Sequence, residues 1–95
     1  MFMVIRRYRV QPHSTRAITK AVRTGFVPIV SRMPALRHYY LVRTGNGEVA
    51  SVSVFEERAS ADESTRRAAE WVQENLAEYV VAPPDVMIGE ILVET

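Results

Sequence analysis

Hydrophobic and polar residues alternate most clearly in two runs that flank Thr44-Gly45-Asn46-Gly47. Asn46 and Gly47 both accept the positive φ of a type I′ turn, so the pattern predicts a β-hairpin over residues 35–57. Counting outward from a two-residue turn places Gly45 opposite Glu48. The predicted pairs beyond it are Arg43 with Ala50, Val42 with Ser51, Leu41 with Val52, Tyr40 with Ser53, Tyr39 with Val54 and His38 with Phe55.

This register gives the hairpin one apolar face and one face that combines aromatic rings with polar groups. The apolar face, which is suited to a core, consists of Tyr39, Leu41, Val52 and Val54. The second face consists of His38, Tyr40, Val42, Ser51, Ser53 and Phe55. Because it carries hydroxyls and an imidazole, the second face suits a pocket or an interface better than a dry core.

The rest of the chain predicts two further strands and two helices. The strands are expected over residues 2–10 and 86–94, and the first has Phe2, Val4, Tyr8 and Val10 on one side and Met3 and Ile5 on the other. A helix over about 15–31 begins after Ser14 as N-cap, and Gly25 and Pro28 predict a kink in it. A second helix over about 60–79 begins with a capping box of Ser60 and Glu63.

The second predicted helix carries the only tryptophan of the chain, Trp71. Its narrow apolar stripe consists of Ala61, Thr65, Ala68, Val72, Leu76 and Tyr79, and Trp71 falls on the flank of this stripe. A large ring in that position more often closes the edge of a core or meets a partner than lines a ligand pocket, and both roles are open here.

The order of these elements is β-α-β-β-α-β, which predicts an α+β, ferredoxin-like fold in a single domain over residues 1–95. In this fold a four-stranded antiparallel sheet carries two helices on one face and leaves the other face uncovered. An apolar sheet face of that size needs a cover, and the simplest cover is the same face of a second copy. We therefore expect a homodimer that assembles through the sheet face.

Charge is distributed unevenly although the net charge is only +1. Residues 1–45 hold nine basic residues and no acidic one, whereas residues 46–95 hold three basic and eleven acidic residues. Mutual neutralisation of the two halves is the favoured interpretation, and a basic patch for an anionic partner is the alternative. For Arg6, Arg7 and Arg9 the corresponding choices are solvation at a strand end and contact with an anion.

Composition and motifs argue against several classes of protein. The chain has no cysteine and only two histidines, so no metal site is expected, and the natural default is a cytoplasmic protein. No apolar run approaches the roughly 18 residues of a membrane span. The third predicted strand has one aromatic residue and no glycine, unlike an RNA-recognition strand, so we expect no nucleic-acid partner.

Three stretches together resemble a known family. A kinked helix ending in Met33-Pro34, the hairpin LRHYYLVRTGNGEVASVSVFE and the helix sequence RRAAEWVQENL resemble the antibiotic biosynthesis monooxygenase-like (ABM) proteins of the dimeric α/β-barrel superfamily. The resemblance implies that two ferredoxin-like subunits pack sheet to sheet. It also implies relatives that oxidise aromatic or polyketide-like substrates with neither metal nor flavin, so no cofactor is expected, as well as haem-degrading relatives. The latter use a histidine on the second helix, which has none here.

The resemblance also indicates site residues, because a tryptophan and a nearby asparagine on the second helix commonly help to form the site in these relatives. Trp71 matches that tryptophan, with Arg67 one turn before it and Asn75 one turn after it.

Two hypotheses follow for the function. In the first, the chain is a cofactor-independent monooxygenase that binds a small aromatic ligand, with His38 and Trp71 as catalytic residues. His38 is the side chain whose ordinary pKa suits a base at neutral pH. The ligand-binding candidates are Tyr40, Ser53, Phe55, Arg67 and Asn75. In the second hypothesis, the chain is a non-catalytic dimeric module that binds a ligand or only interacts with a partner.

Overall fold

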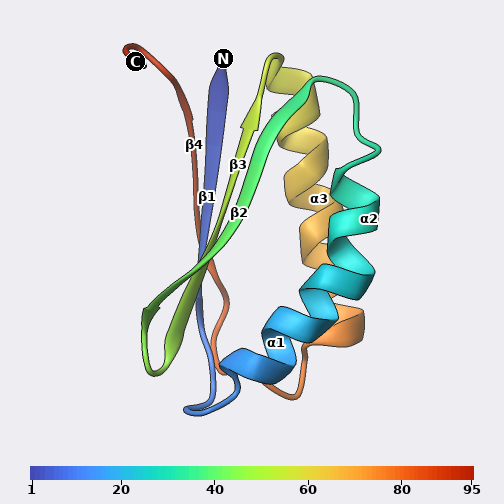
Figure 1. Ribbon diagram of the computed structural model, residues 1–95, viewed down its shortest axis with the longest axis vertical. Coiled ribbons are helices and arrows are strands. Elements are labelled where there is room, and N and C mark those ends of the chain that lie inside the picture. Colours follow the sequence, from blue (N-terminus) through green and yellow to red (C-terminus); the bar gives the residue numbers. More distant parts are fainter.

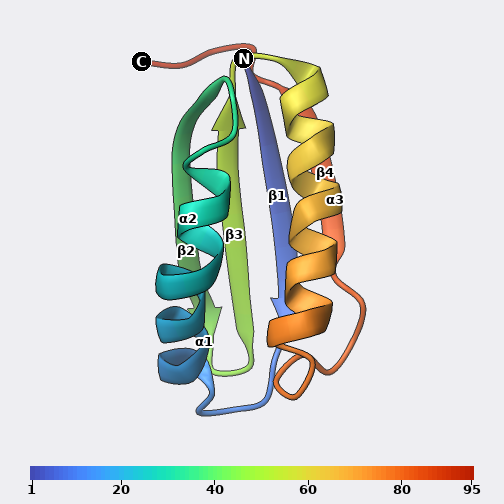
Figure 2. The same ribbon diagram turned by 90° about the vertical axis from the view of Figure 1, so that its right-hand side faces the viewer.

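The computed structural model describes residues 1–95 and shows a four-stranded antiparallel sheet with its helices on one face (Figure 1). The strands are β1 (Phe2–Arg9), β2 (Leu36–Gly45), β3 (Glu48–Phe55) and β4 (Asp85–Glu90), and their order in the sheet is β2-β3-β1-β4. The view from the helix side shows both helical segments running along the sheet (Figure 2). The predicted ferredoxin-like βαββαβ fold is confirmed.

The first helical segment bends where the sequence predicts a kink. It consists of α1 (Thr15–Ala21), a π-helical turn η1 (Val22–Phe26) and α2 (Val27–Val30). Gly25 lies inside the π-turn and Pro28 follows at the start of α2. Ser14 occupies the predicted N-cap position, but its hydroxyl donates to the Gln11 carbonyl at 2.6 Å instead of capping the helix.

The second helix, α3 (Arg58–Asn75), begins two residues earlier than the sequence indicates, with Glu57 as N-cap. The predicted capping box is therefore wrong, because Ser60 lies buried within the first turn and Glu63 pairs with Arg66. The buried residues of α3 are Ser60, Ala61, Ser64, Ala68 and Trp71. Two small serines in this stripe let the helix approach the sheet closely, and Trp71 lies in the stripe instead of on its flank.

The hairpin turn is placed as predicted, with Gly45 opposite Glu48, but its conformation and the register beyond it are not. Neither Asn46 nor Gly47 has a positive φ, so the turn is not of type I′. A register shift at Thr44 adds one residue to β2, which pairs Tyr40 with Val52. The remaining pairs are Arg43 with Val49, Val42 with Ala50, Leu41 with Ser51, Tyr39 with Ser53 and His38 with Val54, and a second register shift at Arg37 pairs Leu36 with Phe55.

The bulge corrects the predicted faces of β3. Paired residues of antiparallel strands point to the same face, so Ser51, Ser53 and Phe55 lie beneath the helices together with Tyr39 and Leu41. Val52 and Val54 lie on the open face with His38 and Tyr40. The predicted faces of β1 and β2 are confirmed, whereas those of β3 are reversed, because a one-residue slip exchanges the two faces of a strand.

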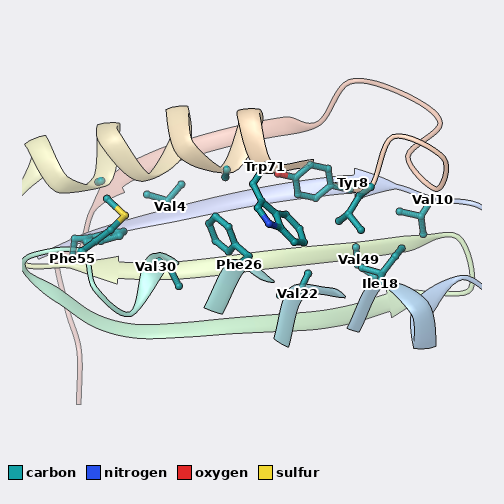
Figure 3. Packing of buried hydrophobic residues seen from close by; sticks show 14 residues of the cluster. Val4, Tyr8, Val10, Ile18, Val22, Phe26, Val30, Val49, Phe55 and Trp71 are labelled. Atoms are coloured by element: carbon teal, nitrogen blue, oxygen red, sulfur yellow. The ribbon is translucent and has the colours of Figure 1, made fainter. Parts of the chain in front are cut away.

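The core lies between the sheet and the helices (Figure 3). Phe55, Val4, Ile18 and Val30 are each 1% exposed or less. Phe26 of the π-turn packs against both Trp71 and Tyr39, with ring centroids 5.6 Å and 5.7 Å apart. The two helical segments and the hairpin therefore meet at this aromatic group.

The open face of the sheet carries an apolar row across all the strands. Tyr40, Val52, Ile5 and Met87 are consecutive partners in the ladder. Tyr40 is 53% exposed and Met87 is 62% exposed, and both lie on edge strands. Beyond β4, which ends four residues before the predicted strand end, Leu92 and Val93 are 85% and 84% exposed. This face has no cover within the chain.

We predict that Gly25→Ala destabilises the protein, although the same change in an ordinary helix is stabilising by about 1 kcal/mol. A Cβ at position 25 would lie 2.8 Å from Cζ2 of Trp71, which is closer than carbon atoms pack. The expected loss in the free energy of unfolding is about 1–3 kcal/mol, measured by urea denaturation.

Two variants serve as controls for this prediction. Gly89→Ala is expected to be nearly neutral, because no heavy atom lies within 4 Å of a Cβ there. In a Trp71→Phe background the penalty of Gly25→Ala should shrink, because phenylalanine has one ring where the indole of Trp71 has two. An equal penalty in both backgrounds would show that the close approach of Gly25 and Trp71 is not its cause.

Candidate functional site

The most unusual residue of the core is an arginine. Along β1 the buried positions alternate, which places Arg6 on the helix side between Val4 and Tyr8. Its side chain is only 2% exposed. Nη2 donates to Ser53 Oγ across 3.5 Å, while Nε and Nη1 are buried with no hydrogen-bond partner. Buried polar groups normally have partners, so an unpaired guanidinium in a core needs an explanation.

Two tyrosines surround this guanidinium. Burial raises the pKa of Tyr39 to about 12 against the opposing effect of Arg6, and burial also raises the pKa of Tyr8, which Arg6 opposes through charge and a hydrogen bond. Burial lowers the pKa of Arg6, but a guanidinium stays protonated throughout the physiological range. Near neutral pH the group therefore consists of one buried cation and two neutral phenols.

A small cavity of about 30 Å³ adjoins Arg6. Besides Arg6, its polar lining is limited to Ser51 and the tyrosines 8 and 39, and the remaining wall is apolar. Trp71 points into this region from α3 beside Phe26, and Gly25 leaves room for its ring (Figure 3). The volume suffices for a water-sized group and not for an aromatic ring.

A larger groove opens beside this cavity. It has a volume of about 620 Å³, and its lining residues come mainly from α3 and from the connection that leads to β4. Its lining includes Ala69, Gln73, Val81, Pro83 and Val86. Arg6, Tyr8, Val72 and Val80 line both the groove and the small cavity. The groove has the size of a small-molecule site, and Arg6 lies in the wall where it meets the cavity.

The structure separates the site residues that the sequence indicates into three places. Trp71, Ser53 and Phe55 are buried on the helix side of the sheet. His38 and Tyr40 lie on the open face, where their rings stack with centroids 6.1 Å apart. Arg67 and Asn75 lie on the exposed side of α3, where Arg67 pairs with Glu63 at 3.3 Å and Asn75 donates to the Trp71 carbonyl at 2.9 Å.

His38 and Trp71 therefore lie on opposite sides of the sheet, and the structure does not bring them into one pocket. A different group of residues does meet in the small cavity, namely Arg6, Tyr8, Tyr39 and Ser51. The sequence does not lead to this group as a whole. The signal was the alternation in β1, because a residue between Val4 and Tyr8 at a spacing of two shares their buried face.

Several ion pairs join the basic and the acidic halves of the chain. Arg7 pairs with Glu48 at 2.9 Å and with Asp85 at 3.2 Å, and Arg37 pairs with Glu56 at 2.6 Å. These pairs support the interpretation that the two halves neutralise one another.

Neither a metal cluster nor a membrane span is found. No group of three or more His, Cys, Asp and Glu side chains could hold a metal ion. None of the helices has the length and apolar character needed to cross a membrane.

Fold and site together define a ferredoxin-like α+β protein with an apolar helix-side groove that ends at a buried arginine. The family model for antibiotic biosynthesis monooxygenase matches residues 1–80, and the chain belongs to this family. A comparison with curated proteins finds no match.

Solved structures share the fold over nearly the whole chain. The NE2512 protein of Nitrosomonas europaea, of unknown function, superposes with a TM-score of 0.83 at 15% identity, covering 99% of this chain and 91% of its own. The ActVA-Orf6 monooxygenase of Streptomyces coelicolor, solved in complex with nanaomycin D, gives 0.74 at 16% identity, covering 98% and 92%. SnoaB, a cofactor-independent oxygenase from Streptomyces nogalater, gives 0.74 at 10% identity, covering 98% and 94%.

We predict that Tyr39 makes the protein less stable at alkaline pH. The unfolded chain releases the Tyr39 proton near pH 10, whereas the folded chain holds it to about pH 12. The protonated Tyr39 phenol therefore contributes fully to the stability of the folded chain below pH 10, and this contribution is lost as the pH rises to about 12. Relative to Tyr39→Phe, the wild-type protein should lose about 1 kcal/mol of unfolding free energy between pH 9 and 11, measured by urea denaturation.

The matched control is Tyr40→Phe, which changes the neighbouring, exposed ring on the other face. This variant should retain the alkaline loss. If Tyr39→Phe retains it as fully as Tyr40→Phe does, Tyr39 is not its source.

Proposed function

We propose that this protein binds a small aromatic or polyketide-like molecule in the helix-side groove and acts on it as a cofactor-independent monooxygenase. The observation that carries the proposal is the groove itself, because its volume of about 620 Å³ suits such a ligand and its inner end reaches Arg6 and Tyr8. Family membership supports the reaction class. So does the fold shared with a monooxygenase and a cofactor-independent oxygenase.

In a reaction of this class the substrate itself reduces oxygen. One oxygen atom enters the product, and the other leaves as water with the two hydrogens that the substrate loses. The residues of this chain bind and orient the ring system against Val72 and Val86 in the groove, exclude water, and donate hydrogen bonds from Tyr8 and, in the adjoining cavity, from Tyr39. Ser53 accepts a hydrogen bond from Arg6, and Phe55 lies fully buried in the core.

A non-catalytic ligand-binding module is the alternative function, and one observation favours it. No carboxylate or imidazole lines the cavity or the groove, so the chain offers no ordinary general base there. His38 lies on the other side of the sheet. A chemically inert binding protein would have the same groove.

We predict that hydroxylated polycyclic aromatics quench the fluorescence of Trp71, the single tryptophan, and that at least one of them supports oxygen uptake. Ala69→Phe should abolish the quenching, because Ala69 is exposed and lines the groove. Ala59→Phe on the same helix is exposed and lies outside the groove, so it should bind as the wild type does. Fluorescence titration and an oxygen electrode measure the two effects.

The outcomes separate the two functions. Quenching without oxygen uptake across the panel supports the binding module and contradicts the monooxygenase. Equal binding by Ala69→Phe and Ala59→Phe would move the site out of the groove.

We also propose that two copies assemble as a homodimer through the open sheet face. The apolar row of Tyr40, Val52, Ile5 and Met87 would be covered by the same row of the second copy. His38, which stacks on Tyr40, then belongs to this interface.

We predict that Met87→Glu converts the dimer to a monomer, because it places a charge within the proposed apolar contact. Light scattering at micromolar concentration measures the mass. Val27→Glu is the control, since Val27 is an exposed apolar residue of α2 on the helix side. A monomeric mass for the wild-type protein would contradict the proposed dimer.

A further inference from the structure

Arg6 has far more hydrogen-bonding capacity than the chain uses. A guanidinium offers five N–H donors in a planar fork, and this chain uses few of them. Nη2 donates to Ser53 Oγ at 3.5 Å, the outer limit of a hydrogen bond, and the Tyr8 hydroxyl is the other polar group that interacts with the guanidinium by hydrogen bonding. Nε and Nη1 have no partner although both are buried. Leaving a charged group in this state opposes folding, so the site retains it for something that binds there.

No group of this chain neutralises Arg6. The linings of the cavity and of the groove contain no aspartate or glutamate. Tyr8 and Tyr39 stay protonated near neutral pH because burial raises the pKa of each. A second copy packed on the open face would lie on the far side of the sheet from Arg6. The missing counter-charge therefore has to come from a molecule that enters the groove.

The geometry also indicates where the negative charge would lie. Ser51 is the ladder partner of Arg6, and its Oγ is buried and unpartnered as well. Both residues line the small cavity of about 30 Å³, which has room for an oxygen atom and not for a ring. The adjoining groove of about 620 Å³ has room for the rings.

We propose that the groove selects aromatic ligands that carry an ionised oxygen, a carboxylate or a phenolate, and that Arg6 and Ser51 bind this oxygen in the small cavity. The proposal rests on the ligand-binding function proposed above and names its ligand class. It also accounts for the absence of a general base, since a ligand that enters as an anion needs none to become charged.

The first test compares ligands of nearly equal shape by calorimetry on the wild-type protein. 2-Naphthoate should bind at least tenfold more tightly than neutral 2-naphthamide, because only the carboxylate neutralises Arg6. For the phenolate arm, 2-naphthol should gain affinity as the pH rises toward its own pKa, whereas 2-methoxynaphthalene should not. A preference confined to the naphthoate assigns the site to carboxylates, and one confined to the ionised naphthol assigns it to phenolates.

The second test uses the unbound protein to separate recognition from folding. Arg6→Met removes the charge at similar length, so it should abolish the preference for the anion while raising the melting temperature or leaving it unchanged. A structural role for Arg6 would instead lower the melting temperature. Arg9→Met is the matched control, because Arg9 is an exposed arginine of the same strand and, unlike Arg7, has no ion pair, so its loss should change neither property.

Ser51→Ala provides a milder variant that keeps the charge, and it should weaken naphthoate binding without affecting naphthamide. Equal affinity of the wild-type protein for naphthoate and naphthamide, unaffected by Arg6→Met, would overturn the anion site and leave the ligand-binding function standing. Binding of neither the anionic nor the neutral aromatics would overturn both.

Discussion

Moving a guanidinium out of water without a counter-ion opposes folding by several kcal/mol, and the arrangement around Arg6 has to tolerate that penalty. Ser53 and the two neighbouring tyrosines replace part of the lost hydration, and they come from three different strands. The apolar side chains of both helical segments seal the region above them. Arg6 and its polar neighbours thus lie against the largest apolar cluster of the molecule. A ligand that reaches Arg6 therefore meets a water-poor environment in which charges interact strongly.

The sheet divides the molecule into two chemically different surfaces. On the helix side, β1 and β3 contribute Arg6, Tyr8, Ser51 and Ser53 to a buried polar group. On the open side, the same strands contribute Ile5 and Val52 to an apolar row. Register shifts at Thr44 and at Arg37 each add one residue to β2, and the shift at Thr44 determines which residues of β3 lie opposite Tyr39 and Tyr40.

The sequence predicts the element order, the two-residue turn and the bend in the first helix, because each depends on local chemistry such as turn residues, apolar spacing and Pro28. It does not predict the bulge. Asn-Gly permits a type I′ turn but does not require one, and an extra residue in a strand depends on how the whole sheet twists. The reversed faces of β3 follow from that omission alone. For this reason the sequence places Ser53 and Phe55 on the wrong side of the sheet.

The candidate site could be predicted only in part for a similar reason. The sequence indicates Trp71 as a candidate site residue because it is the only tryptophan and lies on an amphipathic helix. Arg6 is harder to identify, because a charged residue in a strand with three arginines normally indicates a solvated strand end. Only its spacing of two from Val4 and from Tyr8 distinguishes it from Arg7 and Arg9. The sequence favours His38 as a general base because of its residue type, but residue type does not indicate which face of a sheet a residue occupies.

The alternation in β1 has a consequence for how this chain can change over time. Even-numbered residues from Phe2 to Tyr8 line the buried side, and odd-numbered residues from Met3 to Arg9 line the open side. Point substitutions can alter either surface without disturbing the other. Deletion of Val4, in contrast, would exchange both surfaces at once beyond that point, moving Arg6 into the open and Ile5 and Arg7 beneath the helices. Variation in this segment of the family should therefore proceed by substitution and not by insertion or deletion.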